Sequence, residues 1–342
     1  MDKQRGIAII GTGYWGINYV RVFNELSQTN VVAVCDQSSG RLQEVERRFP
    51  DIPLTTDAAE VLSRDDVDAV VVATPATTHY QVARDCLTAG KHVLVEKPIT
   101  IKAANAENLI KLAETKGLIL MVGHVFLYNA GVRKVKEYLN QDEASRVYYV
   151  YSQRTNLGPV RHDVNALWDL APHDVSIFNY LLDSTPNWVS ATGSKLLQNC
   201  CEDVGFVSLG YQNGVIGHIH VSWADPNKVR EVVVVSSDKR VVFDDIKTME
   251  QVRVFEKGIA TEEVDAPNSY GEFRFQVRDG DIISPRIEAN EPLKSQCSHF
   301  SECITQNKRP FTDGQAGLEV VQVMEAIDRS LAQNGTPVQV NT

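Results

Sequence analysis

Short apolar runs alternate with helical patterns in the first half of the chain, and this alternation constrains the fold more than any other feature. The apolar runs cover residues 7–10, 31–34, 68–73, 92–95 and 119–122, and the helical patterns cover residues 14–26, 41–49, 58–62, 80–89 and 103–116. A continuous apolar run is typical of a strand that is buried on both faces of a parallel sheet. With right-handed crossovers, the pattern predicts a doubly wound α/β Rossmann domain over residues 1–124.

The pattern changes after about residue 124, where strands follow one another with short turns between them. Asn213-Gly214, a strong hairpin signal, separates two of these strands. The expected strands cover residues 147–153, 206–211, 215–223, 231–235 and 240–243, and the expected helices cover residues 175–182 and 315–331. We therefore predict an α+β domain over residues 125–342 with a large, mostly antiparallel open sheet.

Composition excludes several classes of protein. The 342 residues include 34 Lys and Arg against 44 Asp and Glu, and the net charge of −10 repels phosphate backbones, so we expect no nucleic-acid partner. No segment approaches the roughly eighteen uncharged apolar residues of a membrane helix, and the polar start of the chain does not resemble a signal peptide. The six cysteines form no C-x-x-C pair, so we predict reduced thiols in a cytoplasmic protein and no metal site.

A glycine motif follows the first strand and opens the first helix. Gly11, Gly13 and Gly16 form G-x-G-x-x-G around Tyr14 and Trp15, in the context that a dinucleotide-binding loop requires. The first glycine allows the tight turn, and the second lets a pyrophosphate approach the backbone at the helix N-terminus. The third permits close packing of the helix on the sheet. We predict that all five residues contribute to cofactor binding.

Asp36 ends the second strand, twenty residues after Gly16. Its carboxylate can accept hydrogen bonds from the adenosine ribose hydroxyls and would repel a 2′-phosphate, which favours NAD over NADP. Arg41 lies nearby in the sequence and provides the alternative, because an arginine can hold that phosphate.

Polar residues also follow three other strands, where ligands of open α/β sheets bind. We expect these residues to face one crevice: Thr74, Pro75 and His79, then Glu96 and Lys97, and then His124. Lys97 comes directly after a buried strand and before a proline, which favours a functional role. A helix-capping or packed histidine explains His79 and His124 equally well.

The second half contains a carboxylate and an imidazole four residues apart. Pro172 is tolerated best in a first helical turn, so we expect a helix to begin near it. Asp169 and His173 then share a face, and the carboxylate would orient the imidazole and support its charged form. Such a histidine would titrate near neutrality, as a general base requires. An N-capping aspartate beside a packed histidine would give the same pattern.

Taken together, the N-terminal glycine motif, Glu96-Lys97-Pro98 and the Asp169/His173 pair resemble the Gfo/Idh/MocA dehydrogenases over nearly the whole chain. The resemblance implies a tightly held nicotinamide cofactor, a sugar or polyol substrate, and Lys97, Asp169 and His173 as the catalytic group. It also implies homodimers or homotetramers that form through the open face of the second sheet.

Residues 154–165 depart from the double glycine of many family members. This segment, which is rich in arginine and asparagine, resembles the branch of nucleotide-sugar 3-dehydrogenases that act on UDP-N-acetylglucosamine. Arg154 and Arg161 could clamp a diphosphate, with Asn156 and His124 as further substrate contacts. Surface arginines that pair with Asp163 are the alternative.

These features predict an NAD-dependent enzyme that oxidises a secondary hydroxyl of a sugar to a ketone. His173 would remove the hydroxyl proton, and cationic Lys97 would stabilise the developing alkoxide. A free-polyol dehydrogenase of the inositol type is the first alternative. A dinucleotide-binding regulatory protein without catalysis is the second, because a fold alone does not determine function.

Overall fold

Six parallel strands form the sheet of the first half, in the order β3-β2-β1-β4-β5-β6. The computed structural model describes residues 4–142, 145–161, 163–197, 201–260, 276–278 and 280–341. The strands are β1 (Arg5–Ile10), β2 (Thr29–Cys35), β3 (Leu54–Thr55), β4 (Ala69–Val72), β5 (His92–Glu96) and β6 (Leu120–Gly123). All four residues of β4 are fully buried, as its run of alanine and valine predicts. The predicted Rossmann fold is confirmed.

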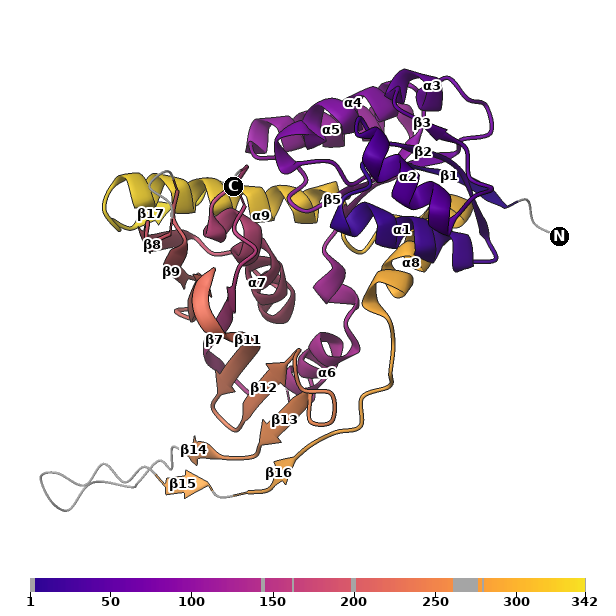
Figure 1. Ribbon diagram of the computed structural model, residues 1–342. Helices are drawn as coiled ribbons and strands as arrows, with labels where there is room; N and C mark the ends of the chain where they lie inside the picture. Colours follow the sequence, from indigo (N-terminus) through magenta and orange to yellow (C-terminus); the bar gives the residue numbers. More distant parts are fainter. Residues whose placement is uncertain are drawn as a thin grey trace, which may run out of the picture.

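Helices connect these strands and cover both faces of the sheet (Figure 1). They are α1 (Tyr14–Glu25), α2 (Ser39–Arg48), α3 (Ala58–Leu62), η1 (Ala76–Thr78), α4 (His79–Thr88) and α5 (Ala103–Lys116). The α5 helix has the predicted bounds and ends at Gly117, whose φ of +63° is easily reached only by glycine. The sequence patterns missed β3, because a two-residue strand has no periodicity to read.

Nine strands form the second sheet, in the order β16-β13-β12-β11-β7-β10-β9-β8-β17. They are β7 (Val147–Leu157), β8 (Trp188–Ser194), β9 (Val204–Gly210), β10 (Ile216–Ser222), β11 (Ala224–Ser236), β12 (Arg240–Asp244), β13 (Val252–Phe255), β16 (Ile282–Ile283) and β17 (Val338–Gln339), with β14 (Gly258–Ala260) and β15 (Gln276–Arg278) as a separate pair. The predicted hairpins β9/β10 and β11/β12 are antiparallel, whereas β7 and β10 run parallel. The expectation of a large, mostly antiparallel sheet is confirmed.

The remaining helices join the two halves. They are η2 (Val125–Tyr128), α6 (Ala130–Leu139), α7 (Ala166–Leu182), α8 (Pro292–Gln306) and α9 (Gly314–Ala332). In Figure 1, α8 lies against α1, and α9 extends from the first half along α7. The α8 residues Leu293, Cys297 and Phe300 share one apolar cluster with Tyr19 and Phe23. The segment after residue 124 therefore completes the core of the first half.

The α7 helix begins earlier than predicted. Its N-cap is Asn165, whose side chain accepts a hydrogen bond from the Trp168 amide at 2.9 Å, and Pro172 lies inside the helix. A proline in a helix interior leaves the carbonyl four residues earlier without its N–H donor. Most α7 residues before and after Pro172 are buried, and this packing outweighs the local cost. The prediction that the helix begins near Pro172 was wrong for this reason.

Candidate active site

The glycine loop has the geometry that a dinucleotide requires. Gly11 has a φ of +93°, and a Cβ on this residue would lie 2.7 Å from the Ala73 carbonyl. A Cβ on Gly16 would lie 1.9 Å from the Gly11 oxygen, so both positions need glycine. At Gly13, by contrast, a Cβ would meet no described atom within 4 Å, and the N-terminus of α1 has no side-chain cap. An anion can therefore reach the first amides of α1, as the pyrophosphate of a dinucleotide would.

The two aromatic residues of the motif differ in position. Tyr14 is 80% exposed and Trp15 is partly buried, and their rings meet edge to face with centroids 5.5 Å apart. Tyr14 therefore lies at the open side of the loop. The part that either ring plays in cofactor binding stays a prediction.

Asp36 holds the glycine loop in place. Its Oδ2 accepts hydrogen bonds from the Thr12 amide at 2.7 Å and the Thr12 hydroxyl at 2.9 Å, and its Oδ1 accepts one from the Ser38 amide at 2.8 Å. Burial alone would raise the pKa of Asp36, but these bonds and the charge of Arg41 outweigh it and lower the pKa. Asp36 is therefore an anion, and Arg41 lies 3.6 Å from its Oδ2.

We expect Asp36→Ala to narrow the preference for NAD over NADP by roughly tenfold or more. The change removes a charged hydrogen-bond acceptor for the ribose, worth about 1.5–3 kcal/mol, and frees Arg41 for a 2′-phosphate. Dissociation constants for both cofactors, measured by quenching of tryptophan fluorescence, check this prediction. An unchanged ratio of the two constants would show that Asp36 supports only the loop.

His79 links two of the predicted strand-end segments. It is buried, and its Nδ1 lies 2.7 Å from the Pro98 carbonyl and its Nε2 2.8 Å from the Thr74 carbonyl. Both ring nitrogens of His79 therefore face backbone carbonyl groups. Any contribution of His79 to cofactor binding therefore acts through the segments at Thr74–Pro75 and Pro98.

Glu96 is directed into the core. Its Oε1 accepts a hydrogen bond from the Tyr19 hydroxyl at 2.6 Å, and its Oε2 accepts one from the Lys97 amide at 3.1 Å. Gln296 of α8 donates to the Tyr19 oxygen at 2.8 Å. Burial raises the pKa of Glu96 above its ordinary value. The structure therefore gives Glu96 an anchoring role at the base of Lys97.

Lys97 meets Asp169 at the N-terminal end of α7. The Lys97 side chain is 7% exposed, and its Nζ donates to the Asp169 carbonyl at 2.7 Å and lies 3.7 Å from Asp169 Oδ1. The Asp169 oxygens also accept bonds from Arg161 Nη1 at 3.0 Å and from Trp223 Nε1 at 3.2 Å. Burial lowers the pKa of Lys97, although Asp169 and Glu96 oppose this shift. The sequence analysis missed Trp223, which no local motif marks.

His173 lies one turn further along α7 and packs against Phe126. The two ring centroids are 5.0 Å apart, and the Nδ1 of His173 is buried without a described protein partner. Burial lowers the pKa of His173 well below its ordinary value, and the charges of Lys97 and Arg154 lower it further. The expected titration near neutrality is therefore wrong. In the described chain no hydrogen bond joins His173 to Asp169, since the carboxylate is held by Arg161 and Trp223.

The pH dependence of catalysis should reflect this low pKa. If neutral His173 accepts the substrate proton, kcat/KM should stay high below pH 6.5, the ordinary pKa of histidine, and should fall only at lower pH. The sign follows from burial and nearby cations, which disfavour the protonated ring. A profile of kcat/KM against pH checks this, and an acid limb centred above 6.5 would contradict it.

Arg154 is buried against the ring of Phe126. Its Nε and Nη2 donate to the two oxygens of Asp174 at 2.9 Å each, and its guanidinium carbon lies 4.4 Å from the Phe126 ring centroid. Arg154 and Asp174 are 3% and 0% exposed. This ion pair occupies guanidinium N–H groups that a diphosphate would need. The structure therefore gives Arg154 a supporting position against Phe126, the ring that also packs on His173.

Asn156 lies near the end of β7, and Arg161 lies in the loop between β7 and α7. Arg161 donates to both oxygens of Asp163 and to Asp169, and its side chain is 36% exposed. The predicted pairing with Asp163 is therefore present, but Nη1 of Arg161 also donates to Asp169, the residue that contacts Lys97. The Asn156 side chain donates to the Gly158 carbonyl.

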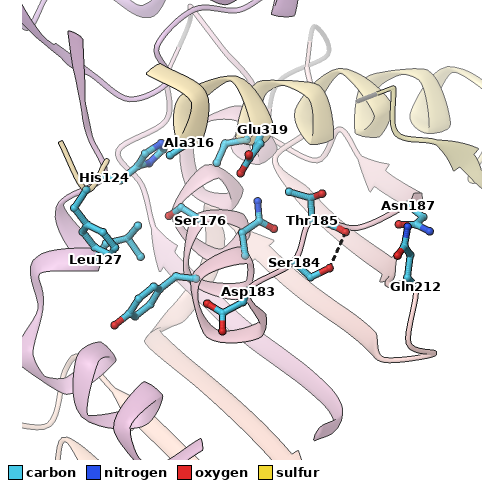
Figure 2. Close-up of a pocket in the computed structure, with 14 residues that line it drawn as sticks. His124, Leu127, Ser176, Asp183, Ser184, Thr185, Asn187, Gln212, Ala316 and Glu319 are labelled. Atoms are coloured by element: carbon cyan, nitrogen blue, oxygen red, sulfur yellow. Dashed lines mark hydrogen bonds between the residues drawn. The ribbon is translucent and has the colours of Figure 1, made fainter. Parts of the chain in front are cut away.

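His124 follows β6 and is buried within range of the charge of Lys97. It is 1% exposed, and neither ring nitrogen has a described protein partner. Burial and the charge of Lys97 lower its pKa to about 4, so the ring is neutral at physiological pH. His124 also lines a separate cavity between η2, α7 and α9 (Figure 2).

Comparison with known proteins agrees with this geometry. Residues 5–124 match the family model described as "Oxidoreductase family, NAD-binding Rossmann fold", and residues 132–242 match the "GFO/IDH/MocA C-terminal domain". The chain belongs to the GFO/IDH/MocA oxidoreductase family. As a member of this family it is an oxidoreductase with NAD as its cofactor, and the glycine loop and Asp36 have the geometry to hold NAD. The resemblance found in the sequence is confirmed.

Three proteins of known name resemble the chain over its whole length. UDP-N-acetylglucosamine 3-dehydrogenase of Acidithiobacillus ferrooxidans is 26% identical over 94% of this chain and 97% of its own. The scyllo-inositol 2-dehydrogenase of Bacillus subtilis is 24% identical over 100% and 98%. The structure of GenD2 from gentamicin A biosynthesis, solved with NAD, has a TM-score of 0.82 and 25% identity over 100% and 98% of the two chains. Two other curated relatives are matched over only 54% and 58% of their length.

The structure also bears on membrane association. Within the described ranges, no helix combines the length and apolar character that crossing a bilayer requires.

Proposed function

We propose that this oxidoreductase oxidises a secondary hydroxyl of a sugar, with the hydroxyl between Lys97 and His173. The observation that carries the proposal is the contact of Lys97 Nζ with Asp169 Oδ1, 3.7 Å apart, at the end of β5. In the sheet β5 pairs with β4, which pairs with β1, the strand that leads into the glycine loop. NAD would accept the hydride from the carbinol carbon. The retained lysine, aspartate and histidine favour this role over a dinucleotide-binding regulatory protein.

Each residue of the group has a distinct proposed role. His173, neutral because of its low pKa, takes the hydroxyl proton. Lys97 supplies a cation in a buried site, where it stabilises the developing alkoxide more strongly than it would in water. Asp169 contacts Lys97 and not His173. Hydrogen bonds from Arg161 and Trp223 fix the Asp169 carboxylate. Asp169 is therefore the positioning residue for the lysine.

The substrate that we propose is a nucleotide sugar of the UDP-N-acetylglucosamine type. The relative that acts on this compound matches nearly the whole chain, and Arg161 lies partly exposed beside the Lys97 centre. Because Arg154 is held by Asp174, we assign the diphosphate contact to Arg161 alone.

A free polyol of the inositol type is the second candidate. Arg161 already pairs with two carboxylates, those of Asp163 and Asp169, and a substrate without phosphate would leave these pairs intact. The full-length match to an inositol dehydrogenase supports the same candidate.

Arg161→Ala separates the two substrates. For a UDP-sugar, loss of a charged hydrogen bond worth about 1.5–3 kcal/mol should raise KM roughly tenfold to hundredfold, with no change in NAD affinity. Steady-state kinetics with UDP-N-acetylglucosamine and with myo-inositol checks this, and Arg64→Ala, which alters an arginine paired with exposed Asp66 outside the proposed site, is the control. If Arg161→Ala does not shift KM for the UDP-sugar and inositol is turned over instead, the polyol assignment replaces the nucleotide-sugar one.

We also propose that the chain forms a homodimer or homotetramer through the open face of the second sheet. Tyr149, Phe206 and Ile216 each expose more than two fifths of their surface on neighbouring strands, and Phe206 stacks on His220 with centroids 4.4 Å apart. An exposed apolar face of this kind is typical of an interaction surface. Light scattering would overturn the proposal by giving the mass of a monomer.

A further inference from the structure

A cavity of about 710 Å³ lies between η2, α7 and α9, and its described lining does not include Lys97, Asp169 or His173. Figure 2 shows it, with His124 and Ala316 at one end and Asn187 and Gln212 at the other. His124 is the one residue of the proposed site that lines it among the described residues. Cavities of this size hold small ligands in many proteins.

Two side chains on its walls have polar atoms without protein partners. Both ring nitrogens of His124 and both amide atoms of Asn179 are buried, and none makes a hydrogen bond to a described residue. Buried polar atoms nearly always have a partner, and the four that lack a described partner here belong to two residues of the cavity lining. The pKa of His124 is lowered to about 4, so a neutral ring both donates and accepts a hydrogen bond there.

The charges on the walls restrict what that molecule can be. Asp183 and Glu319 carry carboxyl groups, and none of the described lining residues is lysine or arginine. Lys136 neutralises Asp183 from outside the lining, which leaves Glu319 as the acidic group of the cavity. With one acidic group and no basic group in the described lining, the walls suit a neutral molecule or a monocation better than a polyanion.

The rest of the lining is rich in hydroxyl and amide groups. Ser176, Ser184 and Thr185 contribute hydroxyls, and the rings of Tyr180 and Phe311 meet edge to face with centroids 5.4 Å apart. Aromatic rings with a few placed polar groups are typical of sites that bind small organic molecules. Here the many hydroxyl and amide partners match a molecule with several hydroxyls.

We propose that this cavity binds a second, non-reacting ligand, a neutral or cationic hydroxylated molecule such as a cyclitol or a hexosamine, through His124, Asn179 and Glu319. The inference is independent of the identity of the sugar oxidised at Lys97. Because His124 also lies close enough to feel the charge of Lys97, the ligand would contact the wall of the proposed active site.

Calorimetric titration of the NAD-loaded Lys97→Ala protein tests the proposal without turnover. Glucosamine is expected to bind at one site, and myo-inositol at this site and additionally at Lys97 only if it is the substrate. UDP should not compete for the cavity. Asn179→Leu in the same protein should weaken both probes roughly tenfold, since two neutral hydrogen bonds are lost. Asn108→Leu, an exposed residue of α5, is the matched control and should change neither affinity.

Glu319→Gln provides a second variant in case Asn179→Leu fails to fold, which circular dichroism would reveal. It should weaken glucosamine roughly tenfold and leave myo-inositol unchanged, because only the cation loses a charged partner. If neither probe binds, the cavity holds water only and the proposal is wrong. If both probes bind but neither variant weakens them, they bind elsewhere and the proposal is equally wrong.

Discussion

His173→Asn should lower kcat by about 10²–10⁴-fold while leaving NAD affinity nearly unchanged, since this range is typical for loss of a general base. The neutral imidazole is buried against Phe126, one helical turn from Asp169. Asparagine is smaller and polar but cannot take up the proton, so the local packing changes less than the chemistry. Stopped-flow measurement of NAD reduction, with cofactor affinity determined in parallel, checks both parts of the prediction.

The matched control is His218→Asn, on the exposed face of β10, which should not change kcat. An unchanged kcat for His173→Asn would place the base elsewhere. His124 would then be the next candidate, because it is also buried beside Lys97. His162, the other histidine near this loop in the sequence, lies outside the described residues.

Asp174→Asn should destabilise the protein by about 3–5 kcal/mol, the range expected when one partner of a buried ion pair is removed. Arg154 donates two hydrogen bonds of 2.9 Å to this carboxylate, and both residues are fully buried. The substitution keeps the volume but leaves the guanidinium charge without a counterion. Urea unfolding at neutral pH, followed by circular dichroism, measures the loss.

The double variant Arg154→Met/Asp174→Leu should recover most of that stability, because two apolar side chains leave no buried charge. The double variant also tests the role of Arg154 in function. If Arg154 only supports the site, KM for any sugar should change far less than for Arg161→Ala. A loss below about 1 kcal/mol for Asp174→Asn, which is the range of exposed pairs, would contradict the buried pairing.

The first half of the fold was predictable because its signals are local. The central parallel strands, such as β4, are buried on both faces and so appear as continuous apolar runs, and the glycine loop needs glycine where backbones approach closely. The family resemblance grouped Lys97, Asp169 and His173, but it assigned Asp169 to His173, and the contact of Asp169 with Lys97 was not predicted.

Other features depend on contacts between distant segments and were not predictable. Trp223, directly after β10, donates a hydrogen bond to Asp169, and Arg154 of β7 pairs with Asp174 of α7. These bonds changed the predicted roles, since Asp169 holds Lys97 and Arg154 is no longer available to a phosphate. The start of α7 was misplaced because burial of its face outweighs the local effect of Pro172.

Hydride transfer from a sugar tests the central claim most directly. The purified protein would be incubated with NAD and either UDP-N-acetylglucosamine or myo-inositol carrying deuterium on its ring carbons, and the reduced cofactor would be analysed by mass spectrometry. We predict deuterium in the reduced cofactor with one of these compounds, and its absence with Lys97→Ala and His173→Asn. Binding of NAD and of both compounds without any transfer of deuterium would contradict the account and favour a dinucleotide-binding protein without catalysis.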